Sequence, residues 1–182
     1  MEFFKILLFL SLAASGPAGA CDENRLIELC KGAGSQDSCS VEGFFCGKNA
    51  DYFVVLDNDQ NSRILYRRLH SAQAQPERLV RLSKSDYSNT RIFPLARRRS
   101  DAVLVIEDHY LETYDEEPVY AWTFVSPTWN VIGVIESLAQ PTVLKSRKGW
   151  VVRVSQSVDH KIRTKMYCVT TDRIDVDAIR CY

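Results

Sequence analysis

The sequence predicts a mainly β protein, an antiparallel sandwich or barrel with a short disulfide-stapled helix near its N-terminus. Short segments rich in aromatic and β-branched residues follow one another, separated by stretches of turn-forming residues. No long segments with a helical apolar period alternate with these strands, which argues against a parallel α/β sheet. The chain also contains six cysteines, an even number that favours disulfides in an exported protein.

Residues 1–20 have the three parts of a secretory signal peptide. Lys5 supplies a positive charge, residues 6–14 are almost wholly apolar, and Ala18, Gly19 and Ala20 are the small residues of a cleavage site. The apolar run is far shorter than the roughly 20 residues that a membrane-spanning helix needs. We therefore expect a secreted, extracellular protein without a membrane span.

Residues 21–50 are predicted to form a cysteine-rich helix and loop of the same domain. Asp22 can cap a helix over residues 22–31, and residues 35–46 are predicted to be a loop that only disulfides hold. The sequence leaves the pairing of the cysteines open. The expected disulfide residues are Cys21, Cys30, Cys39, Cys46, Cys168 and Cys181. Their spacing is not that of a zinc site, so we expect neither a metal nor a cofactor.

Residues 51–182 are predicted to form the β-rich body, in which three hairpins give the strongest signals. The hairpins span residues 52–70, 102–125 and 150–170, and they start about 50 residues apart, a spacing that would also fit a threefold repeat. Weaker strands are expected at residues 77–83, 91–95, 130–138 and 143–145, with residues 174–181 closing the sheet. In the third hairpin we expect Ile162, Met166 and Cys168 to face the core, and Arg163 and Lys165 to face water.

Charge is segregated along the chain, although its 23 basic and 23 acidic residues balance. Basic residues dominate segments 63–99 and 145–165, whereas segment 101–117 contains acidic residues and no Lys or Arg. Two interpretations stay open: the basic and acidic strands pair with each other, or they form surface patches that attract a partner of opposite charge. If the basic residues form a surface patch, the predicted contact residues are Arg97, Arg98, Arg99, Lys145, Arg147, Lys148, Lys161, Arg163 and Lys165. The three consecutive arginines would also fit a processing site, and the zero net charge does not favour a nucleic-acid partner.

No catalytic residue is assigned from the sequence. The chain contains no Gly-x-Ser-x-Gly elbow, no His-Glu-x-x-His motif and no phosphate-binding loop. Glu107 and His109 form the best local acid/base pair, because alternate residues of a strand share a face. A ribonuclease-like set would combine these two residues with His70 and Arg68.

In its format the chain resembles the small secreted cysteine-containing effector proteins of plant-pathogenic fungi. The shared features are a signal peptide, a small size, an even number of cysteines, a β-rich body and the lack of a catalytic motif. The resemblance carries over no functional residue, and it implies a virulence function through binding of a host or extracellular protein. The alternatives are a secreted hydrolase such as a ribonuclease, and a β-barrel that binds a small ligand.

Overall fold

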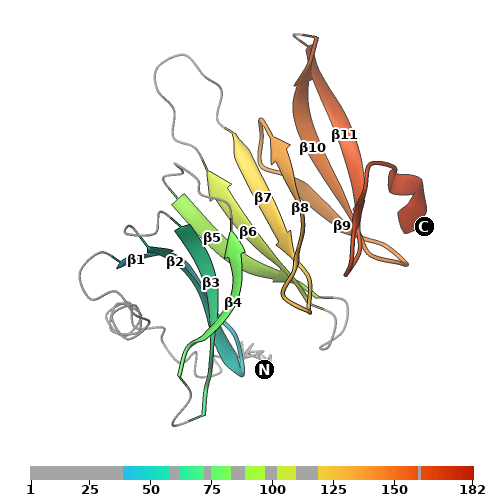
Figure 1. Ribbon diagram of the computed structural model, residues 1–182. Helices are drawn as coiled ribbons and strands as arrows, with labels where there is room; N and C mark the ends of the chain where they lie inside the picture. The colour runs from blue at the N-terminus through green and yellow to red at the C-terminus, as the bar shows by residue number, and fades with distance from the viewer. Residues whose placement is uncertain are drawn as a thin grey trace, which may run out of the picture.

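A computed structural model describes residues 39–57, 62–71, 75–82, 89–96, 102–109, 119–159 and 161–182. These residues form twelve strands in three antiparallel sheets and one short 3₁₀-helix (Figure 1). Sheet A contains β1 (Cys39–Cys46), β2 (Ala50–Asp57), β3 (Ser62–Leu69) and β4 (Glu77–Leu82). Sheet B contains β5 (Asn89–Leu95), β6 (Val103–His109), β7 (Tyr120–Val125) and β8 (Val131–Ser137). Sheet C contains β9 (Thr142–Lys145), β10 (Trp150–Val158), β11 (Lys161–Val169) and β12 (Ile174–Asp175), and the helix η1 (Ala178–Cys181) follows it.

Each sheet is a meander in which strands that follow one another in the chain are neighbours. The three predicted hairpins are confirmed as β2–β3, β6–β7 and β10–β11, and each forms the central pair of its own sheet. The regular spacing of the hairpins in the sequence therefore reflects three similar four-stranded sheets.

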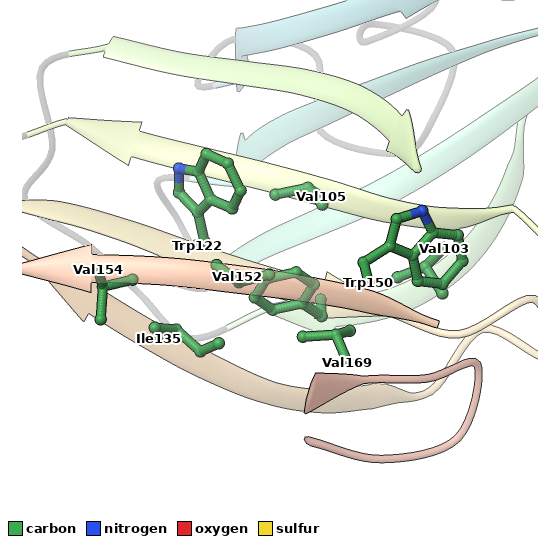
Figure 2. Packing of buried hydrophobic residues seen from close by; sticks show 9 residues of the cluster. Val103, Val105, Trp122, Ile135, Trp150, Val152, Val154 and Val169 are labelled. Carbon is green, nitrogen blue, oxygen red and sulfur yellow. The ribbon is translucent and has the colours of Figure 1, made fainter. Parts of the chain in front are cut away.

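Sheet B lies between the other two sheets (Figure 1), so the described residues form a layered, sandwich-like arrangement of sheets. One hydrophobic cluster joins sheet B to sheet C and contains Trp122 and Phe124 of β7 together with Val152 and Val154 of β10. Figure 2 shows Trp122, Val152 and Val154 among its members. All nine of its buried members are the aromatic or β-branched residues that strands favour on a buried face.

A second hydrophobic cluster joins sheet B to sheet A, where Val54 and Leu65 pack against Leu104 and Ile106. Successive side chains of a strand point to opposite faces, so β6 supplies alternate residues to the two clusters. All its residues from 103 to 108 are buried, which makes β6 a strand covered on both sides.

The loop predicted over residues 35–46 is wrong from Cys39 onward. Residues 39–46 are not a loop, because they form β1, which pairs antiparallel with β2. Val41 pairs with Val55 and Gly43 with Val54, so Glu42 is the extra residue of a β-bulge. A bulge shifts the alternation of side chains by one residue and hides the strand in the sequence. The predicted signal peptide (residues 1–20) and helix (residues 22–31) lie outside the described residues.

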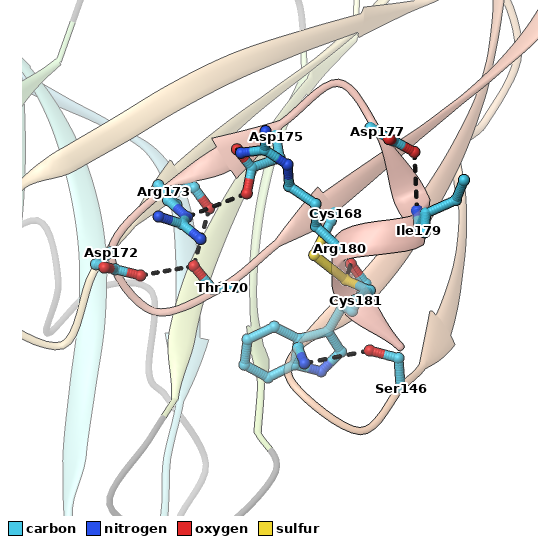
Figure 3. Close-up of a disulfide and its surroundings, with 12 residues drawn as sticks. Ser146, Cys168, Thr170, Asp172, Arg173, Asp175, Asp177, Ile179, Arg180 and Cys181 are labelled. Carbon is cyan, nitrogen blue, oxygen red and sulfur yellow. Dashed lines mark hydrogen bonds and ion pairs between the residues drawn. A yellow bond between two sulfur atoms is a disulfide. The ribbon is translucent and has the colours of Figure 1, made fainter.

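The C-terminal expectation is confirmed only for residues 174 and 175, which form β12 beside β11. The chain then turns into η1, whose first turn is capped by the Asp177 side chain accepting from the Ile179 N–H. A disulfide between Cys168 and Cys181 fastens η1 to β11 (Figure 3).

Cys46 is also disulfide-bonded, and no cysteine that the structure describes is free. Cys21 and Cys30 lie outside the described ranges. Within those ranges, no helix has the length and apolar character to cross a bilayer.

Candidate functional site: a basic strand and a polar pocket

Three cationic side chains line one face of β11 next to the turn that joins it to β10. Lys161, Arg163 and Lys165 are all exposed, and alternate residues on a strand are about 6.6 Å apart. Their cross-strand partners in β10 are Val158, Gln156 and Val154, none of which is charged. We call these three cations the basic row.

The basic row is distinguished by three cations on one strand face that all lack an acidic partner among the described residues. None of its three side chains forms an ion pair with a carboxylate of the described residues, whereas several arginines elsewhere do. Arg63, Arg67 and Arg91 pair with Asp108, Glu77 and Glu107, respectively. Pairing with the acidic segment therefore accounts for Arg63 and Arg91, but not for the basic row.

The remaining predicted contact residues do not lie beside the basic row. Lys145 ends β9, and Arg147 and Lys148 belong to the turn before β10. Lys145 pairs with the first residue of β10 and Lys161 with the last, so the two groups are roughly 25 Å apart along the nine-residue strand. Arg97, Arg98 and Arg99 lie outside the described residues.

The expected faces of β11 are wrong for two of three apolar residues. Ile162 is 65% exposed and Met166 is 46% exposed, because they lie on the face of the hairpin opposite to that of Val154, which packs in the core. Only Cys168 is buried, on the same side of the strand, where the disulfide fastens η1. The outer face of β11 thus presents apolar side chains to solvent, and the other face presents the basic row.

A polar pocket of about 320 Å³ lies where β5, β6 and β7 meet at one end of sheet B. The strand register places Arg91 opposite Glu107, and His109 between Asn89 and Tyr120. The lining residues are Asn89, Thr90, Arg91, Glu107, His109, Tyr120 and Gln140. Glu107 and His109, the acid/base pair proposed from the sequence, therefore line one pocket.

Glu107 is only 5% exposed, and two neighbouring side chains hold its carboxylate in a fixed position. Its Oε2 accepts a hydrogen bond of 2.8 Å from the Trp122 indole Nε1, and its Oε1 lies 3.7 Å from Arg91 Nη1. The His109 ring stacks on Tyr120 with 4.4 Å between ring centroids. A carboxylate, an imidazole and a guanidinium are groups that can exchange protons with a ligand and stabilise its negative charge.

The two other members of the ribonuclease-like set are not among the pocket residues. Arg68 lies in β3 of sheet A, and His70 follows that strand, with its Nε2 2.8 Å from Asp51 Oδ1. Arg91 and Tyr120 line the pocket instead, and the sequence did not indicate either of them as a site residue. Only the pairing of β5 and β7 with β6 brings them to Glu107 and His109, and a single sequence does not state that pairing.

Lys165 of the basic row also lines a separate pocket of about 270 Å³ between β8 and β10, together with Glu136 and Gln156. In the part of the chain that the structure describes, no three His, Cys, Asp or Glu side chains are placed to hold a metal ion. No protein-family model matches the chain, and neither does any curated protein or solved structure. The function is therefore argued from the chemistry of these two regions.

Proposed function

We propose that this chain is a secreted effector-type binding protein that uses the basic row to hold an acidic region of a host or extracellular protein. The observation that carries the proposal is the exposed row of Lys161, Arg163 and Lys165 without an acidic partner among the described residues. Other basic residues, such as Arg63 and Arg67, already have carboxylate partners within the fold.

Such a row is expected to contribute little to affinity and more to the rate of association. An exposed ion pair contributes about 0.2–1 kcal/mol, so three pairs alone support only weak binding. Like charges gathered on one face also raise the rate of encounter with an acidic surface, and this effect falls as salt is added. Tight binding would need further contacts next to the row.

Export is part of this proposal. Residues 1–20 would direct the chain to the secretory route and be removed after Ala20. The Cys168–Cys181 disulfide and the bonded Cys46 support an oxidising environment, because disulfides persist mainly outside the cytosol. N-terminal sequencing of the secreted product tests this step, and a mature chain that starts at Cys21 is the expected result.

The binding proposal is tested by titrating the protein into fluorescent poly-glutamate of one defined length. The variant Lys161→Glu/Arg163→Glu/Lys165→Glu is expected to lose affinity about tenfold or more at low salt. The matched control Arg78→Glu/Lys145→Glu/Lys148→Glu makes the same change of net charge at exposed sites elsewhere. Its affinity should fall much less; an equal loss in both variants would refute a role for the row itself.

A second candidate function is phosphodiester cleavage in the polar pocket, because the pocket brings Glu107, His109 and Arg91 together. On RNA, Glu107 would take the proton of the attacking 2′-hydroxyl, and His109 would protonate the leaving 5′-oxygen. Arg91 would stabilise the charge that develops on the phosphate oxygens.

This second candidate is tested with purified protein and an RNA substrate. His109→Ala should reduce the rate by about 10²-fold or more, as expected for loss of a general acid. Gln140→Ala, which removes a lining residue without acid/base chemistry, should retain most of the rate. Equal rates for the wild type and His109→Ala would exclude His109 from the reaction. A small-ligand barrel receives no comparable support, because the described strands form three separate sheets that pack through hydrophobic clusters.

A further inference from the structure

The basic row lies on a strand whose second edge is open. β10 pairs with β11 along its whole length, from Val158 opposite Lys161 to Trp150 opposite Val169. On the other side, β12 pairs only with Cys168 and Val169. Within the described residues, the outer edge of residues 161–167 therefore has no neighbouring strand. Such an edge presents backbone N–H and C=O groups that can form the hydrogen bonds of an added strand.

The side chains along this edge alternate between two chemistries. The basic row occupies one face, and Ile162, Thr164 and Met166 occupy the other. An added strand would place its own alternate side chains about 5 Å from these residues, close enough for cross-strand contacts. A complementary segment therefore alternates acidic residues, opposite the basic row, with apolar residues opposite Ile162 and Met166.

Two simpler explanations of the edge fit less well. Lysines on an exposed edge can serve only to prevent aggregation, but then the exposed Ile162 and Met166 beside them would work against that purpose. Pairing with a second copy of β11 in the register centred on Arg163 would place cations opposite cations, with Lys161 against Lys165. Like charges directly opposite each other are destabilising.

We infer that β11 binds its partner by strand addition, and that the partner supplies an extended segment with alternating acidic and apolar residues. The inference rests on the proposed binding function and specifies the chemistry of the partner. Main-chain hydrogen bonds to residues 161–167 give affinity that the ion pairs alone do not provide, and the two side-chain rows select the sequence.

The test uses three fluorescent seven-residue probes on the full mature protein. The first is Glu-Val-Glu-Val-Glu-Val-Glu, and the second has the same residues in two blocks, Glu-Glu-Glu-Glu-Val-Val-Val. The third is the alternating peptide with alternate backbone nitrogens methylated, which removes donors and leaves the side chains in place. Fluorescence anisotropy gives the affinities, and amide hydrogen exchange reports on residues 161–167.

The alternating peptide is expected to bind about tenfold more tightly than the other two, a difference of about 1.4 kcal/mol, and to slow exchange in residues 161–167. If all three peptides bind equally and the charge reversal of the basic row abolishes binding, strand addition is overturned while the binding function stands. If the charge reversal changes no affinity at all, the binding function itself fails. An RNA oligonucleotide of equal charge that binds as tightly as the alternating peptide would also overturn the inference of a protein partner.

Discussion

Arg63 of β3 donates two parallel hydrogen bonds to Asp108 of β6, from Nη1 to Oδ2 at 2.9 Å and from Nη2 to Oδ1 at 2.6 Å. The pair crosses from sheet A to sheet B, and each residue is 1% exposed. Arg63 Nε also donates to Glu42 in the bulge of β1, and Nη2 to Thr90. Burial lowers the pKa of Arg63, but the hydrogen bond and charge of Asp108, with those of Glu42, raise it more. The guanidinium therefore stays charged inside the fold.

Replacing Arg63 with Met should destabilise the protein strongly, because Asp108 and Glu42 would lose the cation that faces them. Removal of one partner of a buried ion pair costs about 3–5 kcal/mol of the free energy of unfolding. Denaturant unfolding measures the change. Arg81→Met, at an exposed position of β4, is the control and should cost less than about 0.5 kcal/mol. Equal stability of the two variants would contradict a buried, charged Arg63.

Replacing Trp122 with Phe should destabilise the protein through Glu107 as well as through packing. The substitution removes the Nε1 donor from a buried carboxylate, which costs about 1–3 kcal/mol. The same substitution is expected to cost less when Glu107 is already Gln, because a neutral amide needs the donor less than a carboxylate does. A double-mutant cycle by denaturant unfolding measures this difference. Additive effects would mean that the hydrogen bond is no stronger to a carboxylate than to a neutral amide.

Replacing both Cys168 and Cys181 with Ala should lower the free energy of unfolding by about 2–4 kcal/mol, because the disulfide restricts the unfolded chain. The two residues are 13 positions apart in the sequence. Thermal unfolding without reducing agent measures the change, and amide exchange should increase most in η1. An unchanged melting temperature with unchanged exchange in η1 would show that packing alone holds the C-terminal turn.

Gly43→Ala should force β1 away from β5. A Cβ at this position would lie 2.6 Å from the Thr90 carbonyl oxygen, a backbone atom that cannot rotate away. Overpacking of this kind costs about 1–3 kcal/mol. Ser40→Ala, at an exposed position of the same strand, is the control for denaturant unfolding. If both variants unfold at the same denaturant concentration, the two strands are not in close contact.

The sequence predicts strands well where the pattern is local. The hairpin of β10 and β11 appears as two β-rich runs around a polar turn, and its predicted span, residues 150–170, agrees with the observed strands Trp150–Val158 and Lys161–Val169. β1 was missed because the bulge at Glu42 interrupts its alternation. A local pattern also does not show which face of a strand the rest of the fold covers, as the exposed Ile162 and Met166 illustrate.

The candidate site was predictable only in part. Glu107 and His109 could be paired because they are two residues apart on one strand. Arg91 and Tyr120 join them through pairing with neighbouring strands, and the sequence does not specify which strands are neighbours. Arg63 is the clearest omission: a charged residue in a basic segment indicates an exposed surface, but Asp108 and Glu42 allow it to be buried.

Both faces of β6 are covered, so the burial of its apolar residues does not determine its register against the neighbouring strands. A slip of one residue would exchange Val103 and Val105 with Leu104 and Ile106, and every one of them would still be buried. The same slip would turn Asp108 away from Arg63 and Glu107 away from Trp122. The two adjacent acids, Glu107 and Asp108, therefore determine the register of the central strand. The aliphatic residues stabilise the strand in either register.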